Sequence, residues 1–196
     1  MDYVNLLKSQ NPYDRLDAWF KAEWLLNNGM ATREELGRLK DYFLELLSHP
    51  DETVRLHAWQ QSLKLLPLGV INLEDLKVRK GYFLDALNDA EGWLLALDLL
   101  RGRVVTKEEL KEKVPQFLSL LKGNELNKVA SWSLVPQMIS EGVVVRGEAE
   151  ALKRYLFDLL DSPAYDVQFN VLFLIAELYE RGFLKEEDAK NVREKL

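Results

Sequence analysis

The chain has 196 residues, of which 47% are apolar and 30% charged, and its net charge is −6. This length and composition suit a folded domain with a real core, and they exclude a disordered chain, a collagen-like chain and a disulfide-stapled mini-protein. Cysteine is absent, which excludes disulfides, cysteine-ligated zinc, iron–sulfur clusters and a thiol nucleophile, and the acidic balance argues against a general nucleic-acid binder.

Apolar residues recur at helical spacing along the whole chain. The predicted helices cover, in chain order, residues 2–8, 13–28, 33–48, 51–67, 73–88, 90–101, 107–122, 125–140, 147–161, 164–181 and 185–195. We see no strand-like alternation, no domain linker, no signal peptide and no apolar run long enough to cross a membrane. We therefore expect an all-α, cytoplasmic protein with one domain over residues 1–196 and partial helices at both ends.

A short pattern of glycine, two apolar residues and an acidic cluster marks the breaks between helices. Its copies begin at Gly29, Gly69, Arg103, Gly142 and Gly182, at steps of 40, 34, 39 and 40 residues. Glycine just past an apolar run is typical of a helix end, because it enters the left-handed conformation without a Cβ clash. Thr32 and Glu35 then predict a capping box at the start of the next helix. Thr106 and Glu109 predict another.

Two helix types alternate between these breaks. The first type carries an aromatic-apolar block such as Tyr42–Leu47. The second type carries a small residue followed by tryptophan, at Ala18-Trp19, Ala58-Trp59, Gly92-Trp93 and Ser131-Trp132, with Val171-Leu172 in the fifth copy. The third copy has lost about six residues from the turn between its helices. Because each tryptophan flanks the apolar stripe of its helix, we expect the indoles to be core.

The segment from Leu46 to Ala58 resembles the helix-turn-helix of HEAT repeats. In that family an Asp near the turn precedes a Val-Arg pair, and Ala follows three residues later. Asp51, Val54, Arg55 and Ala58 match this pattern, and Pro163, Asp166, Val167 and Val171 match it in part, with Gln168 in place of Arg. The resemblance implies an α-α superhelix, a HEAT-like solenoid of about five helical-hairpin repeats. It further implies second helices along the concave side, a protein-binding scaffold, and no particular partner.

The tryptophan ladder has an alternative interpretation. Exposed aromatic rings can stack on nucleic-acid bases, as in HEAT-like DNA glycosylases. The residues at equivalent positions of the second helices, on the side opposite the apolar stripe, form columns that do not favour nucleic-acid binding. They contain Asp17, Glu91, Asp98 and Glu177 against Lys64, whereas phosphate binding needs a basic track.

One interpretation of acidic clusters such as Glu34-Glu35 and Glu186-Glu187-Asp188 is that they bind a metal ion. They fall in first helical turns, where acids offset the helix dipole, and several have a base four residues later, as Asp75 has Arg79 and Glu150 has Arg154. His49 and His57 precede no Glu, and no nucleophile elbow is present. We assign no catalytic residue, no metal ligand and no cofactor.

The exposed face of the second helices is the candidate binding surface. Its predicted residues are Asp17, Phe20, Trp24, His57, Gln60, Lys64, Leu94, Asp98, Gln137 and Phe173, in columns that also contain Glu91, Ala130, Ser133, Asn170 and Glu177. Several are large and apolar where solvent is expected, which is typical of a binding surface. The structural alternative is that Phe20 and Trp24 pack under the partial amino-terminal helix or against a second copy.

These features together predict a non-enzymatic scaffold or adaptor that binds a protein or peptide in a concave groove. The alternative is a nucleic-acid-binding or base-processing protein of the glycosylase kind. A third interpretation is a regulatory or assembly subunit of an enzyme complex. Because a solenoid exposes an apolar face at each end, a homo-oligomer joined through the ends is a further expectation.

Overall fold

The computed structural model describes residues 3–195, and this part of the chain contains helices and turns but no strand. The all-α prediction is therefore confirmed. No helix in the same range is long and apolar enough to cross a membrane.

Internal contacts divide the chain into two compact units. Unit 1 comprises Met1–Ala86 and Asp98–Val105, and unit 2 comprises Leu87–Leu97 and Thr106–Leu196. Unit 1 contains α1 (Tyr3–Leu6), α2 (Pro12–Phe20), α3 (Ala22–Asn27), α4 (Arg33–Leu44), the 3₁₀ helix η1 (Glu45–Ser48), α5 (Glu52–Leu65), α6 (Leu73–Lys77) and α7 (Lys80–Leu84). Helix α8 (Ala90–Arg101) contributes residues to both units. Unit 2 contains α9 (Lys107–Leu120), α10 (Glu125–Ser140), α11 (Arg146–Glu150), α12 (Lys153–Phe157), the 3₁₀ helix η2 (Asp158–Asp161), α13 (Tyr165–Glu180) and α14 (Glu186–Lys195). The single-domain expectation stays a prediction.

Every predicted helical segment contains helix, but three are interrupted. The segment predicted at residues 13–28 is divided at Lys21, and the segments at 73–88 and 147–161 are each divided near their middle. At the last two breaks the backbone N–H groups of Arg79 and Leu152 donate to the carbonyls three residues earlier, at 2.9 and 3.0 Å. This 3₁₀ pattern tightens the turn. The apolar stripe continues across both breaks, so periodicity alone did not reveal them.

The predicted helix ends are confirmed. Gly29, Gly69, Gly142 and Gly182 all lie in the left-handed region, with φ between 65 and 72°. The capping boxes of Thr32 with Glu35 and of Thr106 with Glu109 are both formed. In the third copy of the pattern Arg103 occupies the glycine position, with φ of 60°.

Arg103→Gly is expected to raise the free energy of unfolding by about 1 kcal/mol. A side chain with a Cβ costs about 1–2 kcal/mol in the left-handed region, and glycine removes this cost. Glycine also increases the conformational entropy of the unfolded chain, which offsets part of the stabilisation. Urea unfolding followed by circular dichroism measures the change. Gly69→Ala is the matched control, because open space surrounds that position and only the φ of 72° disfavours a side chain; it should destabilise the protein. Equal stability of Arg103→Gly and the native chain would contradict the argument.

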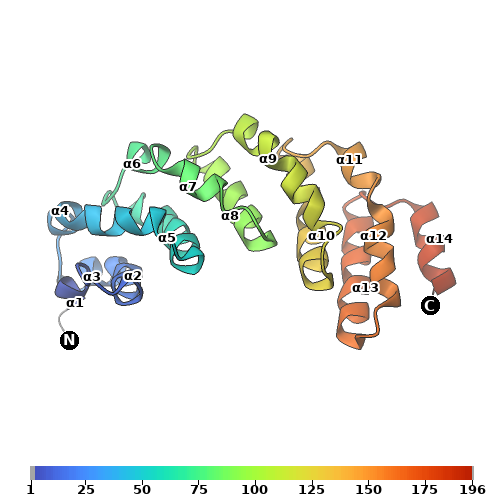
Figure 1. Ribbon diagram of the computed structural model, residues 1–196, viewed down its shortest axis with the longest axis horizontal. Helices are drawn as coiled ribbons and strands as arrows, with labels where there is room; N and C mark the ends of the chain where they lie inside the picture. The colour runs from blue at the N-terminus through green and yellow to red at the C-terminus, as the bar shows by residue number, and fades with distance from the viewer. Residues whose placement is uncertain (1–2, 196) are drawn as a thin grey trace. The chain divides into compact units, whose positions relative to one another are not determined.

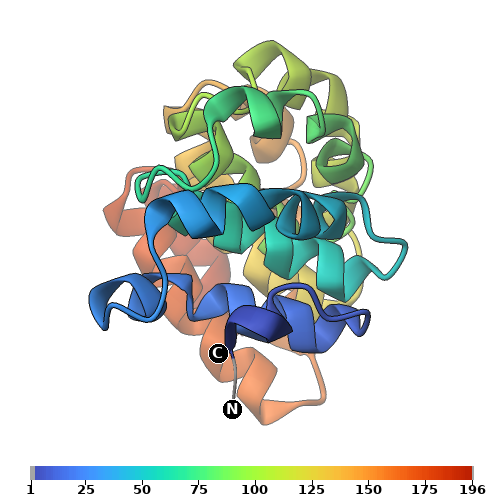
Figure 2. The ribbon, with the colours of Figure 1, turned by 90° about the vertical axis from the view of Figure 1, so that its left-hand side faces the viewer.

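The helices pack as sequential neighbours within each unit. In unit 1, α2 packs on α4 and α5, η1 packs on α5 and α7, and α1 lies against α2 (Figure 2). In unit 2, α10 packs on α9, α12 and α13, and η2 packs on α12 and α13 (Figure 1). The second helices α2, α5, α10 and α13 thus each contact the preceding first helix and another second helix. This arrangement buries one apolar face of each and leaves the opposite face outward.

Candidate functional site

The four tryptophans of the ladder are buried. Trp19, Trp59, Trp93 and Trp132 are each 0% exposed, which confirms the predicted core position. Three of them pack on a phenylalanine 24 residues later: Trp19 on Phe43, Trp59 on Phe83 and Trp93 on Phe117, with ring centroids 5.3–5.6 Å apart. Trp132 packs on Phe183 at 6.1 Å. No face of these rings is open to a nucleic-acid base.

Three of the indoles also bind a helix end. Trp19, Trp59 and Trp132 donate from Nε1 to the carbonyls of Leu7, Leu47 and Leu121, at 3.1, 3.0 and 3.2 Å. The acceptor precedes the indole by 12, 12 and 11 residues. Among the described residues Trp93 Nε1 has no acceptor. Its counterpart, Leu87, lies only six residues before it, because the third turn is shorter.

The turns before α2, α5 and α13 are each held by one polar side chain. Arg15 donates to the carbonyl of Ser9, and Arg55 donates to the carbonyl of His49, both at 2.7 Å. Gln168 donates to the carbonyl of Ser162 at 2.8 Å. All three acceptors lie six residues earlier. Arg55, the base of the Val-Arg pair, therefore has a structural role in this chain, and Gln168 has the same role at the equivalent position of the last repeat.

The acidic clusters act as helix caps and in ion pairs. Asp75 accepts from Lys40 Nζ at 2.9 Å, and Asp188 accepts from Lys153 Nζ at the same distance. Arg79, the expected partner of the Asp75 carboxylate, donates instead to the backbone carbonyl of Asp75 at 2.9 Å. Glu150 likewise pairs with Arg146 rather than Arg154, at 2.8 Å. No group of three metal-ligating side chains forms within the part of the chain that the structure describes.

In unit 1 the structure places most of the predicted surface residues outward. Phe20 is 38% exposed and Trp24 is 47% exposed, while Asp17, Gln60 and Lys64 are exposed and His57 is half-buried. Lys64 Nζ lies 5.9 Å from the centroid of the Phe20 ring, which brings α2 and α5 to one surface. The edge of Trp24 meets Tyr3 of α1 at 5.9 Å, so part of this ring is covered as the structural alternative expected.

A cation and a carboxylate lie beside these rings. Lys21 Nζ binds Asp17 at 2.7 Å and lies 4.7 Å from the centre of the Tyr3 ring. The hydrogen bond that Lys21 Nζ donates to the Asp17 carboxylate raises the pKa of Lys21 above its ordinary value. The ammonium therefore stays charged next to the aromatic pair of Tyr3 and Trp24.

The remaining predicted residues are distributed between the units. In unit 2, Leu94 is 45% exposed, Phe173 is 64% exposed and Gln137 is half-buried. In unit 1, Asp98 is half-buried and pairs with Arg101 at 3.3 Å. Phe173 is the most exposed apolar side chain of the predicted set.

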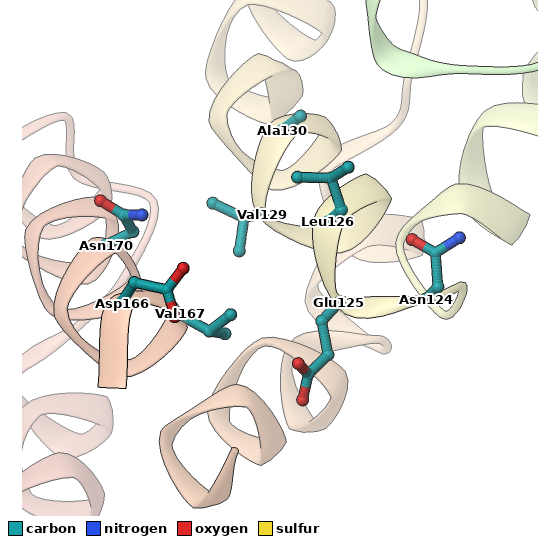
Figure 3. A pocket seen from close by; sticks show the side chains of 8 residues that line it. All are labelled: Asn124, Glu125, Leu126, Val129, Ala130, Asp166, Val167 and Asn170. Carbon is teal, nitrogen blue, oxygen red and sulfur yellow. The ribbon is translucent and has the colours of Figure 1, made fainter. Parts of the chain in front are cut away.

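Unit 2 contains a groove between α10 and α13 with a volume of about 690 Å³. Its lining residues are Asn124, Glu125, Leu126, Val129, Ala130, Asp166, Val167 and Asn170. Figure 3 shows Val129 and Val167 pointing into the space between the two helices, with Asp166 at the rim. Ala130 and Asn170 belong to the predicted outward columns. Leu126, at 81% exposure, was missed, although it lies one helical turn before Ala130 on the same face.

An aromatic stripe runs along the exposed side of α13. Tyr165, Phe169 and Phe173 are 78%, 49% and 64% exposed. The rings of Tyr165 and Phe169 stack at 6.4 Å, and those of Phe169 and Phe173 meet edge-on at 4.8 Å. The sequence columns contained only Phe173. The spacing of four residues was the signal that could have added the other two.

The chain is similar to a protein of Acidianus ambivalens described as "Uncharacterized protein in sor 5'region". The two are 45% identical over 196 residues, which is 100% of this chain and 85% of that protein. No family model matches the chain, and no solved structure matches it.

Proposed function

The chain belongs to one family with the Acidianus ambivalens protein. We propose for this chain a function that is supported by its own surfaces. The proposal is a non-enzymatic, HEAT-like α-solenoid in the cytoplasm that binds a protein or peptide on the outward faces of its second helices. The observation that carries it is the exposure of Phe20, Trp24 and Phe173 on those faces, at 38%, 47% and 64%. Large apolar side chains within a polar surround are typical of binding surfaces.

The HEAT-like part of the proposal is supported by features that recur at equivalent places in three of the repeats. The turn carbonyl bound by Arg15 is bound in the same way by Arg55 and by Gln168. Indoles of the second helices bind the ends of the preceding first helices in three copies. Contacts between successive second helices, α2 with α5 and α10 with α13, are what stacked hairpins require.

The double variant Phe20→Ala/Trp24→Ala is expected to lose its partner while keeping its helicity. Both side chains are partly exposed, so their truncation removes contact area at little cost to the core. Cross-linking and affinity capture from the native host, quantified by mass spectrometry, should show at least about a tenfold loss of specific partners.

Met30→Ala/Val78→Ala is the matched control, since these residues are 48% and 73% exposed in the same unit but lie outside its second helices. The control should capture the same partners as the native chain. If Phe20→Ala/Trp24→Ala captures them equally well, the outward face of α2 and α3 is not the binding surface.

Nucleic-acid binding, the alternative function, is tested separately. Buried indoles and an α13 that contains three acids and no base favour protein binding over base stacking. A salt-dependent mobility shift with duplex DNA would favour the alternative instead.

A further inference from the structure

The outward face of α13 combines acidic and aromatic residues. Asp166, Phe169, Phe173, Glu177 and Glu180 are all exposed and share one side of the helix. The aromatic rings form the middle of this face, and the carboxylates lie at its two ends. From Asp166 to Glu180 it spans about 21 Å, at 1.5 Å per residue.

The groove beside this face is apolar in its floor and acidic at its rim. Leu126, Val129 and Ala130 of α10 line it from one side, and Val167 of α13 from the other (Figure 3). Asp166 is its exposed rim carboxylate. None of the described residues that line the groove is basic. We call the groove together with the stripe of Tyr165, Phe169 and Phe173 the α10–α13 surface.

The net electrostatic character of this surface is negative. Helix α13 contains three acids and no Lys or Arg. Arg181, just beyond its end, compensates Glu177 at 2.7 Å, whereas Asp166 has no side-chain partner within residues 3–195. The amino-terminal end of α13 carries about half a positive charge from the helix dipole, which the full charge of Asp166 exceeds.

We propose that the α10–α13 surface binds a basic amphipathic helix of a partner protein, an inference that rests on the proposed function and names the class of partner. An apolar groove between two helices, continued by an aromatic stripe along one of them, takes the apolar face of a third helix. Lysines and arginines on the edges of that helix pair with Asp166 and lie over the exposed rings of Phe169 and Phe173. The occupant is therefore both apolar and basic.

Charge distinguishes this occupant from two others. A second copy docking through the same surface would bring Asp166 and Glu180 against equally acidic partners. A nucleic acid would bring phosphates against the same carboxylates. Both contacts are repulsive, whereas a basic helix is complementary.

The test is a titration of the full chain with fluorescein-labelled peptides of about 14 residues, long enough to match about 21 Å of α13. One peptide contains Leu and Lys at amphipathic helical spacing, and its matched control has Glu in place of every Lys. We expect the Leu/Lys peptide to bind, as measured by fluorescence anisotropy, and the Leu/Glu peptide not to bind. Phe169→Ala/Phe173→Ala should weaken binding by about tenfold or more. Asp166→Asn should weaken it about threefold at low salt and less at high salt.

Two control variants separate this site from general attraction to an acidic protein. Val78→Ala/Tyr82→Ala removes exposed apolar side chains of unit 1, and Glu34→Gln removes an exposed carboxylate elsewhere. Both should bind the Leu/Lys peptide as the native chain does. Circular dichroism should show unchanged helicity in every variant.

Several outcomes would overturn the inference. They are equal binding of the two peptides, equal binding by Phe169→Ala/Phe173→Ala and the native chain, and displacement of the peptide by single-stranded DNA. A dimer in sedimentation that Phe169→Ala/Phe173→Ala dissociates would assign the surface to a second copy instead. If partner capture depends on Phe20 and Trp24 while the Leu/Lys peptide does not bind, the proposed function stands and this inference fails. If no surface variant changes partner capture, the proposed function itself fails.

Discussion

Trp59→Ala is expected to lower the free energy of unfolding by about 3–5 kcal/mol, because it empties the core of a fully buried indole. The side chain is 0% exposed and packs on the ring of Phe83 at 5.6 Å. Its Nε1 also donates to the carbonyl of Leu47 at 3.0 Å, so the variant leaves a helix-end carbonyl without this donor. Equilibrium urea unfolding measures the loss.

A pair of milder variants tests the hydrogen bond separately from the packing. Trp59→Phe removes ring volume and the bond to Leu47, whereas Trp93→Phe removes ring volume and an N–H without an acceptor among the described residues. We expect Trp59→Phe to be the more destabilising of the two by about 1 kcal/mol, the net value of one hydrogen bond. Equal losses would mean that the indole N–H bonds at the helix ends contribute nothing. A Trp59→Ala variant as stable as the native chain would show that the indole is not core.

Asp75→Ala is expected to cost about 1–3 kcal/mol, because one carboxylate has two functions. It closes the capping box at the start of α6 by accepting from the backbone N–H of Asn72 at 2.9 Å. It also binds Lys40 Nζ at 2.9 Å, where the side chains are only 16% and 29% exposed. Glu35→Ala is the control, since Glu35 is exposed and makes the same cap on Thr32. A cost no larger than that of Glu35→Ala would mean that the pair with Lys40 adds nothing.

The contribution of Asp75 should depend on pH in a defined direction. Burial raises the pKa of its carboxyl, but the bonds from Asn72 and Lys40 outweigh burial, so the pKa lies below its ordinary value of 3.8. A carboxyl with a lowered pKa in the folded state stabilises the protein above its unfolded-state pKa, and this stabilisation is lost as the pH falls through the folded-state pKa. The difference between the native chain and Asp75→Ala should therefore be full at pH 7 and shrink in acid. A difference that grows in acid would contradict this assignment.

Features that depend on neighbouring residues were predictable from the sequence. The left-handed position of Gly29 and the capping box of Thr32 with Glu35 each involve only a few consecutive residues, so their chemistry is local. The burial of Trp59 followed from its place beside an apolar stripe, which is a property of one helix. The outward position of Phe173 followed from the same periodicity.

Features that join distant segments depended on tertiary structure. Lys40 binds Asp75 across 35 residues, and nothing near Asp75 in the sequence points to that cation rather than to Arg79. The absence of an acceptor for Trp93 among the described residues results from a short turn that changes where a helix end lies. Helix breaks such as the one at Arg79 sit inside an uninterrupted apolar stripe, which periodicity interprets as one helix.

The sequence by itself determined the helix type, the helix ends and the inward face of each second helix, because these follow from 3.6-residue periodicity and from caps made by adjacent residues. Only the tertiary structure decided that α10 and α13 leave an apolar groove between them and that Tyr165 and Phe169 extend the exposed stripe of Phe173. The physical reason is that a helix's own pattern identifies the face that avoids water, while the width of a groove and the exposure of a ring depend on how neighbouring helices pack.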